Sequence, residues 1–216
     1  MDCRIIKVEQ GSDEWLDLRR TRITCSRLAD VMAGKKTKRY TRYLEEKSKE
    51  LCGHKGVEET PEWAEHGKKN EGRAMAAYEH HFGVEVEHNI FLISNKYDWL
   101  SCSPDLFHLP EFDDGGEIKC RELFKNYKKE RQWCADHDGL NTACPACNRH
   151  QVQGAMWITG FDRWGFINYY IGSDLEGGQT QKIHRVWIPR NQTLIDQMEA
   201  RCLEFMTEAY EKAGLT

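Results

Sequence analysis

Residues 102–120, CSPDLFHLPEFDDGGEIKC, combine the end of one strand, a turn and the start of another strand. Pro104 has no main-chain N–H, so the strand before it is predicted to end there and to leave Asp105 at its end. A pair of glycines then predicts a turn into a second, short strand. Within that strand Glu117 and Lys119 are two residues apart, so they point to the same face.

Asp105, Glu117 and Lys119 match the chemistry of metal-dependent phosphodiester cleavage. The two carboxylates are hard oxygen ligands suited to Mg²⁺, which keeps several waters and binds a phosphate, and the Ile118 carbonyl is a candidate further ligand. The Lys119 ammonium can orient or deprotonate the attacking water and stabilise charge on the phosphorane. The alternative is a surface hairpin with an aspartate at a turn and an ordinary Glu–Lys pair.

Outward from this stretch, the hydrophobic periodicity alternates between helical and strand spacing. Residues 164–171 are rich in aromatic and β-branched side chains, which is typical of a central strand. The order of elements predicts an α/β (α+β) fold with a central mixed β-sheet flanked by helices. Predicted helices cover residues 12–20, 26–34, 39–52, 62–82, 150–159 and 191–212, and predicted strands cover 84–93, 97–102, 116–120, 164–171 and 183–188.

The helix predicted over 62–82 carries a carboxylate in line with its apolar face. Ala74 and Tyr78 fall at helical spacing on this face, and Glu71 lies three residues before Ala74. Either Glu71 lies at the edge of the apolar stripe in water, or it faces an interior cavity that needs a negative charge.

The composition is that of an ordinary globular chain of 216 residues, which is long enough for one domain. No apolar run approaches the roughly 20 residues needed to cross a bilayer, so no membrane partner is expected. The first residues, MDCRIIK, lack the apolar core of a signal peptide, so we expect a cytoplasmic protein. Without an export signal, the nine cysteines are expected to be reduced thiols or metal ligands.

The formal net charge of −4 is weak evidence against nucleic-acid binding, because binding depends on where the positive charge lies. Basic residues cluster over 19–22, 35–42 and 121–131, and acidic residues near the end of the chain offset them in the sum. The alternative for each cluster is solvated surface charge.

A Cys/His-rich loop over 134–150 has the spacing of a structural zinc site. The loop has little apolar content, so a tetrahedral clamp would give it order. The most economical ligand set is three cysteines with one of two histidines, and the alternative is an exposed loop whose reduced cysteines bind nothing. The candidates are Cys134, His137, Cys144, Cys147 and His150.

The Asp105…Glu117-Ile118-Lys119 pattern resembles the PD-(D/E)xK nuclease superfamily and, within it, the lambda exonuclease or YqaJ-like viral recombinase family. The resemblance extends over almost the whole chain, and several motifs in the right order are far more specific than any one of them. The motifs are Glu14-Trp15-Leu16-x-Leu18-Arg19 with Ile23-Thr24-Cys25-Ser26, Gly67-Lys68-x-x-Glu71, Cys102-Ser103-Pro104-Asp105, Glu117-Ile118-Lys119-Cys120, and Gln151-Val152-Gln153 with Met156-Trp157.

The resemblance implies roles for residues outside the central pattern. Glu71 would face the metal site, and Gln151 would contact the attacking water or the region of the scissile phosphate. Arg19 and Ser26 align with residues that hold a terminal 5′-phosphate, for which a bidentate guanidinium and a hydroxyl are suitable donors. Ser103 either joins them or only forms the turn at the strand end.

The resemblance also implies a single nuclease domain over 1–216, with a restriction-endonuclease-like core. A helical part at about 1–60 would bind the DNA end, and the catalytic core would cover about 61–216. The implied activity is a Mg²⁺-dependent 5′→3′ exonuclease, with Mn²⁺ as a substitute ion, that releases mononucleotides from 5′-phosphorylated ends of linear double-stranded DNA. The 3′ single-stranded tail left behind would serve recombination.

Two other functions stay open at this point. One is a related endonuclease of restriction or resolvase type, and the other is a non-catalytic, zinc-stabilised nucleic-acid-binding module. The resemblance further implies a homotrimeric ring around DNA and a single-strand annealing recombinase as partner. Its location would be the cytoplasm of a bacterial or phage-infected cell, or the nucleus if the virus infects eukaryotes.

Overall fold

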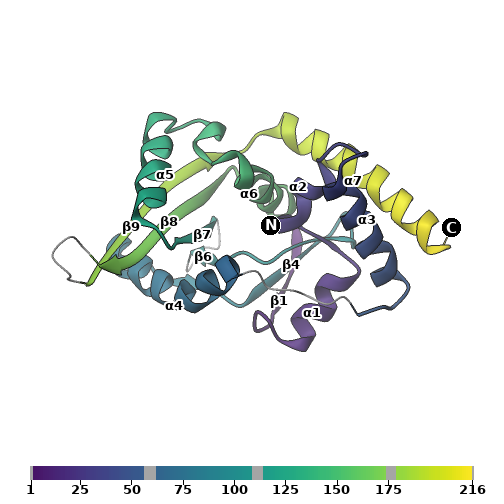
Figure 1. Cartoon of the computed structure of the whole chain (residues 1–216), viewed down its shortest axis with the longest axis horizontal. Helices are drawn as coiled ribbons and strands as arrows, with labels where there is room; N and C mark the ends of the chain where they lie inside the picture. The colour runs from purple at the N-terminus through teal and green to yellow at the C-terminus, as the bar shows by residue number, and fades with distance from the viewer. Residues whose placement is uncertain (1, 56–61, 109–113, 174–178, 216) are drawn as a thin grey trace.

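Two β-sheets form the centre of the fold. The computed structural model describes residues 2–55, 62–108, 114–173 and 179–215 (Figure 1). The strands are β1 (Cys3–Lys7), β2 (Ile23–Thr24), β3 (Val86–Glu87), β4 (Ile90–Ser94), β5 (Leu100–Cys102), β6 (Leu106–His108), β7 (Gly115–Arg121), β8 (Arg163–Ser173) and β9 (Gln179–Pro189).

The helices surround these sheets. They are α1 (Asp13–Arg20), the 3₁₀ helix η1 (Cys25–Arg27), α2 (Leu28–Val31), α3 (Lys38–Leu51), α4 (Glu62–Phe82), α5 (Phe124–Asp136), the 3₁₀ helix η2 (Asn141–Ala143), α6 (Ala146–Thr159) and α7 (Gln192–Ala213). Among the described residues, no helix is long and apolar enough to cross a membrane.

The four-stranded sheet has the order β1-β4-β5-β2, and the five-stranded sheet has the order β3-β6-β7-β8-β9. Each sheet contains one parallel pair, β2 with β5 and β7 with β8, among antiparallel pairs. The predicted α/β class with helices flanking mixed strands is therefore confirmed, although the strands divide into two sheets rather than one.

A broken hairpin carries the chain from one sheet to the other. β4 pairs with β5 and β3 pairs with β6 in one continuous register, which puts Asn89 opposite Asp105 and Ile90 opposite Pro104. Asn89 has a left-handed φ of 57° and Pro104 has no amide hydrogen, so the ladder is interrupted at this point. The strand predicted over 84–93 is therefore two strands, and Asp105 lies at the break.

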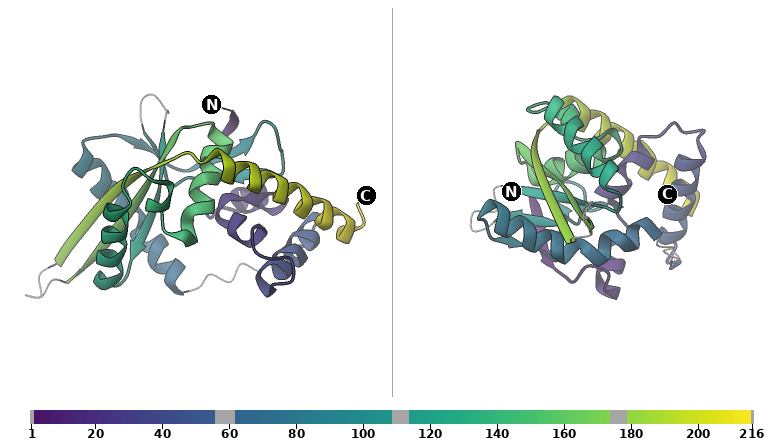
Figure 2. Two further views of the ribbon diagram at one scale, coloured as in Figure 1. Left: turned by 90° about the horizontal axis from the view of Figure 1, so that it is seen from above. Right: turned by 60° about the vertical axis from the view of Figure 1, so that its left-hand side comes forward.

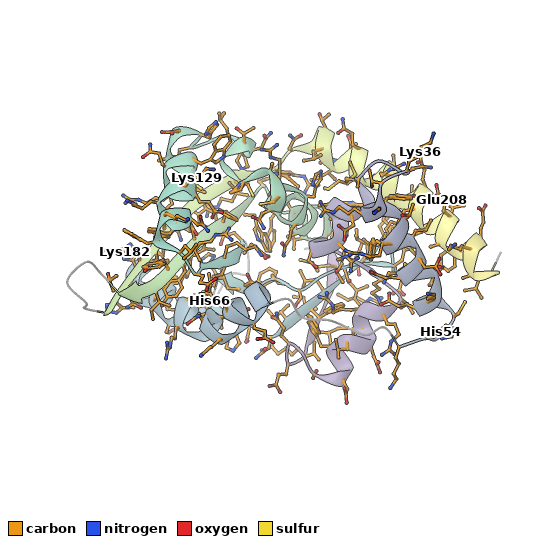
Figure 3. All side chains as sticks on the ribbon, in the orientation of Figure 1. Lys36, His54, His66, Lys129, Lys182 and Glu208 are labelled. Atoms are coloured by element: carbon orange, nitrogen blue, oxygen red, sulfur yellow. The ribbon has the colours of Figure 1, made fainter. Side chains whose placement is uncertain are left out.

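Helices cover both faces of the five-stranded sheet. On one face α4 buries Ala74 and Tyr78 against Ile118 and Ile167 of the sheet. On the other face lie α5 and α6, and here the buried Asn168 amide donates to the Tyr127 carbonyl. The two helices α4 and α5 thus lie on opposite sides of β7–β9, as the labelled His66 on α4 and Lys129 on α5 show (Figures 1 and 3).

The four-stranded sheet is also covered on both faces. Trp15 of α1 packs with Phe91 and Ile93 on one side. The opposite side belongs to the main core, to which α2, α3, α6 and α7 contribute. Figure 2 shows α7 running beside α3 at the end of the molecule away from the β8–β9 hairpin, and Phe205 of α7 packs on the rings of Tyr40 and Tyr43.

The predicted helices are mostly confirmed, with differences at their ends. Ser12 caps α1 through a bond from the Trp15 amide, and Asn191 caps α7 in the same way. The helix predicted over 26–34 is instead η1 followed by the four-residue α2. The elements β1, β2, β6, η2 and α5 were not predicted: the strands are too short for a clear alternation, and α5 has only a weak apolar stripe.

A glycine sets the spacing between α6 and the η1–α2 segment. A methyl group at Gly154 would overlap the Leu28 side chain and lie 2.9 Å from the Cys25 sulfur. Leu28 and Cys25 are themselves buried, so they have little room to move away. Because Gln151 is on α6 and Ser26 is in η1, this close approach helps to position two predicted site residues.

We expect Gly154→Ala to lower the free energy of unfolding by about 1–3 kcal/mol, because overpacking strains a tightly packed core. Gly72→Ala is the matched control, since the same methyl group on exposed Gly72 of α4 meets nothing within 4 Å. The control should be neutral or stabilising by up to about 1 kcal/mol. Denaturant titration measures both, and equal stabilities would contradict this packing.

Candidate active site

The predicted site residues outside the Cys/His segment line one cavity of about 2200 Å³. This volume exceeds the roughly 300–1000 Å³ of small-molecule sites, so a macromolecular substrate fits it better. The cavity extends from the end of α3, where His54 is labelled in Figure 3, to β7 and α6. The predicted residues on its wall are Arg19, Ser26, Glu71, Ser103, Asp105, Glu117, Ile118, Lys119 and Gln151.

The charge of the cavity wall is opposite to that of the whole chain. Eleven lysines and arginines line it against eight aspartates and glutamates, whereas the whole chain has a formal net charge of −4. Positive charge inside a concave surface attracts a polyanion and is less screened than charge on an open surface. The cavity therefore favours a negatively charged polymer.

At one end of the cavity, Asp105, Glu117 and Lys119 come together. Asp105 follows the hairpin break, and its Oδ2 accepts a hydrogen bond of 2.5 Å from the Ile118 amide. Glu117 and Lys119 point to the same face of β7, as predicted, and the Lys119 Nζ lies 2.6 Å from the Glu117 Oε1. Glu117 is 3% exposed, so this carboxylate is out of bulk water.

Gln151 of α6 completes this group from the helix layer above β7. Its amide nitrogen donates to the Glu117 Oε1 at 2.5 Å, and its amide oxygen accepts from the Lys119 Nζ at 3.5 Å. A glutamine can serve both partners because its side chain carries a donor and an acceptor. Gln151 therefore fixes the relative positions of Glu117 and Lys119.

The site holds more negative charge than its single lysine can neutralise. Burial, then the Glu117 carboxylate and then the Glu71 carboxylate raise the pKa of Asp105 well above its usual range, and Lys119 offsets only part of this effect. Glu71 thus acts on Asp105 electrostatically from the apolar stripe of α4. The prediction that Glu71 faces a cavity rather than open water agrees with its place on the cavity wall.

Lys119 remains charged in this setting. Burial opposes its charge, but the Glu117 and Asp105 carboxylates outweigh burial and raise the pKa of the ammonium. Because a charged ammonium donates hydrogen bonds and accepts none, Lys119 is suited to orienting a water and to stabilising negative charge.

The donor set fits a hard divalent cation. Asp105 and Glu117 supply carboxylate oxygens, the Ile118 carbonyl directly follows Glu117 in the chain, and the excess negative charge would be relieved by a cation. Among the described residues, no three His, Cys, Asp or Glu side chains are grouped to hold a metal by themselves. Mg²⁺ tolerates such a site, because it usually keeps waters and takes one or two carboxylates plus substrate phosphate.

Arg19, Ser103 and Trp15 form a connected group on the cavity wall. The Arg19 guanidinium lies 4.1 Å from the centre of the Trp15 ring, and the Trp15 Nε1 donates to the Ser103 hydroxyl at 3.1 Å. Ser26 lies on the same wall, with its hydroxyl 3.1 Å from that of Thr24. Trp15 is a positioning residue that the sequence analysis did not single out, although it stands four residues before Arg19.

A second group of cations on the wall depends on a buried acid. Asp30 is 7% exposed and accepts from Arg27 and Arg39, and Arg27 also pairs with Glu46 at 2.7 Å. The sequence indicates this group only through the three-residue spacing of Arg27 and Asp30. The acid holds both guanidiniums against the wall.

The structure does not assemble the predicted zinc site. The segment 134–150 is largely helical, because α5 extends to Asp136 and α6 begins at Ala146. Cys134 and Cys144 fill the core, Cys147 is exposed, and the His137 ring stacks on Trp133 at 4.0 Å. Apolar packing therefore orders this segment, and within the described ranges its Cys and His residues, including His150, form no metal-binding group.

Fold and site together define the class of the protein, an α/β domain with the PD-(D/E)xK architecture. The model of the YqaJ-like viral recombinase domain matches residues 14–162, so the chain belongs to this family. No curated protein matches the sequence.

Solved exonuclease structures share the fold. An alkaline exonuclease, LHK-Exo, from Laribacter hongkongensis is 21% identical with a TM-score of 0.75, covering 94% of this chain and 95% of that one. Its complex with dAMP is 22% identical with a TM-score of 0.71 and the same coverage. A phage related exonuclease from Haemophilus somnus 129PT is 17% identical with a TM-score of 0.59, covering 89% and 93% of the two chains.

We expect Asp105→Asn to make the metal-free protein more stable and to lower any cleavage rate by ~100-fold or more, because a metal centre supplies several kcal/mol of barrier lowering. The raised pKa of Asp105 means that its ionised form opposes folding. That penalty is absent below the ordinary aspartate pKa of about 3.9 and grows as pH rises through the folded value.

The stability difference between Asp105→Asn and the unaltered protein should therefore shrink as pH falls toward 4. Thermal unfolding in the presence of a chelator, at several pH values, measures it. A variant that is less stable at neutral pH, or that cleaves DNA normally, would contradict this assignment.

Proposed function

We propose that this protein is a Mg²⁺-dependent 5′→3′ exonuclease that acts on 5′-phosphorylated ends of linear double-stranded DNA. The observation that carries the proposal is the single cavity, whose wall joins the carboxylate–lysine group to Arg19, Ser26 and Ser103. Family membership and the shared exonuclease fold support it. The relative solved with dAMP binds a deoxynucleoside monophosphate, which is the kind of product that exonucleolytic cleavage releases.

Asp105, Glu117 and the Ile118 carbonyl would hold the cation in this proposal, and Mn²⁺ would substitute for Mg²⁺. When bound, the ion would act as a Lewis acid on the scissile phosphate and lower the pKa of a bound water. Lys119 orients the attacking water and takes up charge that develops on the phosphoryl oxygens. We assign it this role rather than proton removal, because its raised pKa keeps it an ammonium.

Gln151 and Glu71 support this centre. Gln151 holds Glu117 and Lys119 in fixed relative positions through its two hydrogen bonds. Glu71 adds negative charge toward Asp105, which strengthens attraction for a cation. Neither residue needs to touch the scissile bond to affect its cleavage.

Arg19, Ser26 and Ser103 would bind the terminal phosphate. A guanidinium matches phosphate geometry with two parallel N–H donors, and hydroxyl groups can add single bonds. The Ser103 hydroxyl accepts from Trp15 and retains its own proton to donate, so its structural bond and its phosphate contact are compatible.

The deciding experiment is digestion of linear duplexes with 5′-phosphate or 5′-hydroxyl ends, with Mg²⁺ or a chelator. We expect cleavage with Mg²⁺ only, with about tenfold to 100-fold preference for the phosphorylated end, because a charged hydrogen bond contributes about 1.5–3 kcal/mol. Closed circular DNA should stay intact. Nicking of circles at a similar rate would instead establish an endonuclease.

Arg19→Gln should remove most of the preference for phosphorylated ends while slowing cleavage of hydroxyl ends no more than the loss of one cavity-wall charge does. Arg42→Gln is the matched control, because Arg42 is an exposed arginine on the same cavity wall. The control removes the same charge and should slow both substrates alike. An undiminished preference in Arg19→Gln would reject the phosphate assignment.

We extend the proposal to a ring of three chains around DNA, with a single-strand annealing protein as recombination partner. A ring would explain how a chain with a net charge of −4 can bind DNA, since positive charge need only line the inside of the ring. Light scattering of the purified protein should give three times the 25.3 kDa chain mass. A monomeric mass would reject the ring without affecting the catalytic assignment.

A further inference from the structure

A buried lysine on α3 holds the turn that joins the two proposed phosphate-binding elements. Lys47 is 2% exposed. Its Nζ donates to the carbonyl oxygens of Arg20 at 2.8 Å and Arg22 at 2.7 Å, and lies 3.4 Å from that of Arg19. The Glu50 carboxylate, 2.6 Å away, balances its charge. The ammonium is thus fully occupied by acceptors within the protein.

The bonded carbonyls lie at a functionally sensitive place. α1 carries Arg19 and ends at Arg20, and the last carbonyls of a helix lack partners and carry partial negative charge. The chain then turns into β2 and reaches Ser26 in η1. Lys47 clamps this turn, which lies between Arg19 and Ser26 in the chain.

A second cation braces the same turn from outside. The Arg22 Nη1 donates to the Leu18 carbonyl at 2.8 Å, and its Nε donates to the Asp98 carbonyl at 2.8 Å. The last turn of α1 and the α1–β2 connection are therefore held by hydrogen bonds from two sides. Rigid support of this kind is what precise recognition of a small charged group requires.

Burial of the lysine is costly, which argues against a purely structural role. Taking an ammonium out of water is unfavourable, and apolar residues of similar volume are often at least as stabilising as a buried ion pair. The Arg20 and Arg22 carbonyls could instead bond to water. A buried Lys47 gives the turn one defined geometry that water would not.

We propose that Lys47 is a positioning residue for recognition of the 5′-phosphate, acting through the α1–β2 turn on the spacing of Arg19 and Ser26. This inference rests on the proposed function, since it assumes that these two residues bind the terminal phosphate. It assigns Lys47 no contact with DNA and no part in bond cleavage.

The test is Lys47→Met, which keeps most of the side-chain volume and removes the three donors. We expect the KM for 5′-phosphorylated duplex to rise about tenfold to 100-fold, because small misplacements of binding groups have effects of this size. The kcat and the cleavage of 5′-hydroxyl ends should stay unchanged. Lys49→Met is the matched control: Lys49 is an exposed lysine on the same helix and the same cavity wall, and its loss should affect both ends alike.

The outcomes separate this inference from the proposed function. If the unaltered protein shows no preference for phosphorylated ends, the proposed 5′-end recognition fails and this inference fails with it. If the unaltered protein shows the preference and a folded Lys47→Met variant retains it, only the inference is overturned. Circular dichroism establishes whether the variant is folded.

If the Lys47→Met variant does not fold, the Glu50→Gln variant tests the inference instead. This variant keeps the lysine but removes the carboxylate that orients its ammonium, so the preference for phosphorylated ends should fall by about threefold or more. An unchanged preference in Glu50→Gln would overturn the inference. A loss of preference accompanied by equal loss on hydroxyl ends would also overturn it, because that pattern indicates general damage.

Discussion

The burial of Asp105 beside Glu117 at the hairpin break is the constraint on which the rest of the site depends. Two carboxylates held close together and out of water repel each other, and Lys119 offsets only part of that repulsion. Such an arrangement persists because the surrounding packing enforces it: β6 and β7 are paired, α4 covers one face and α6 the other. In the proposed function, the same unfavourable charge would be relieved by a divalent cation.

The break in the hairpin links the catalytic group to the N-terminal part of the chain. Because the chain changes sheets at residues 103–105, Ser103 faces Trp15 and Arg19 while Asp105 faces Glu117. In the proposed function, the residues assigned to cleavage and to end recognition are therefore separated by one proline, Pro104. A movement of α1 relative to β7 would be transmitted through residues 103–105. The α1–β2 turn and Lys47, which hold α1 in place, are important for this reason.

Much of this arrangement could be predicted from the sequence. The Asp105, Glu117 and Lys119 pattern placed the site at a strand end, and the odd position of Glu71 on an apolar stripe pointed to a charged cavity. The hairpin break was not predictable, because an asparagine in a left-handed conformation leaves no strong signal at position 89. The candidate zinc ligands are not grouped in the part of the chain that the structure describes, and cysteine spacing could not show this, because it does not reveal which thiols fill a core, as Cys134 and Cys144 do.

The most direct test of the central claim is to locate a bound cation. Crystals grown with Mn²⁺ should give an anomalous diffraction peak between the carboxylates of Asp105 and Glu117 and near the Ile118 carbonyl. The peak should disappear in Asp105→Asn crystals grown in the same way. A fully ordered site without a peak, or a peak only elsewhere in the molecule, would contradict the claim that these buried carboxylates form a metal-dependent catalytic centre.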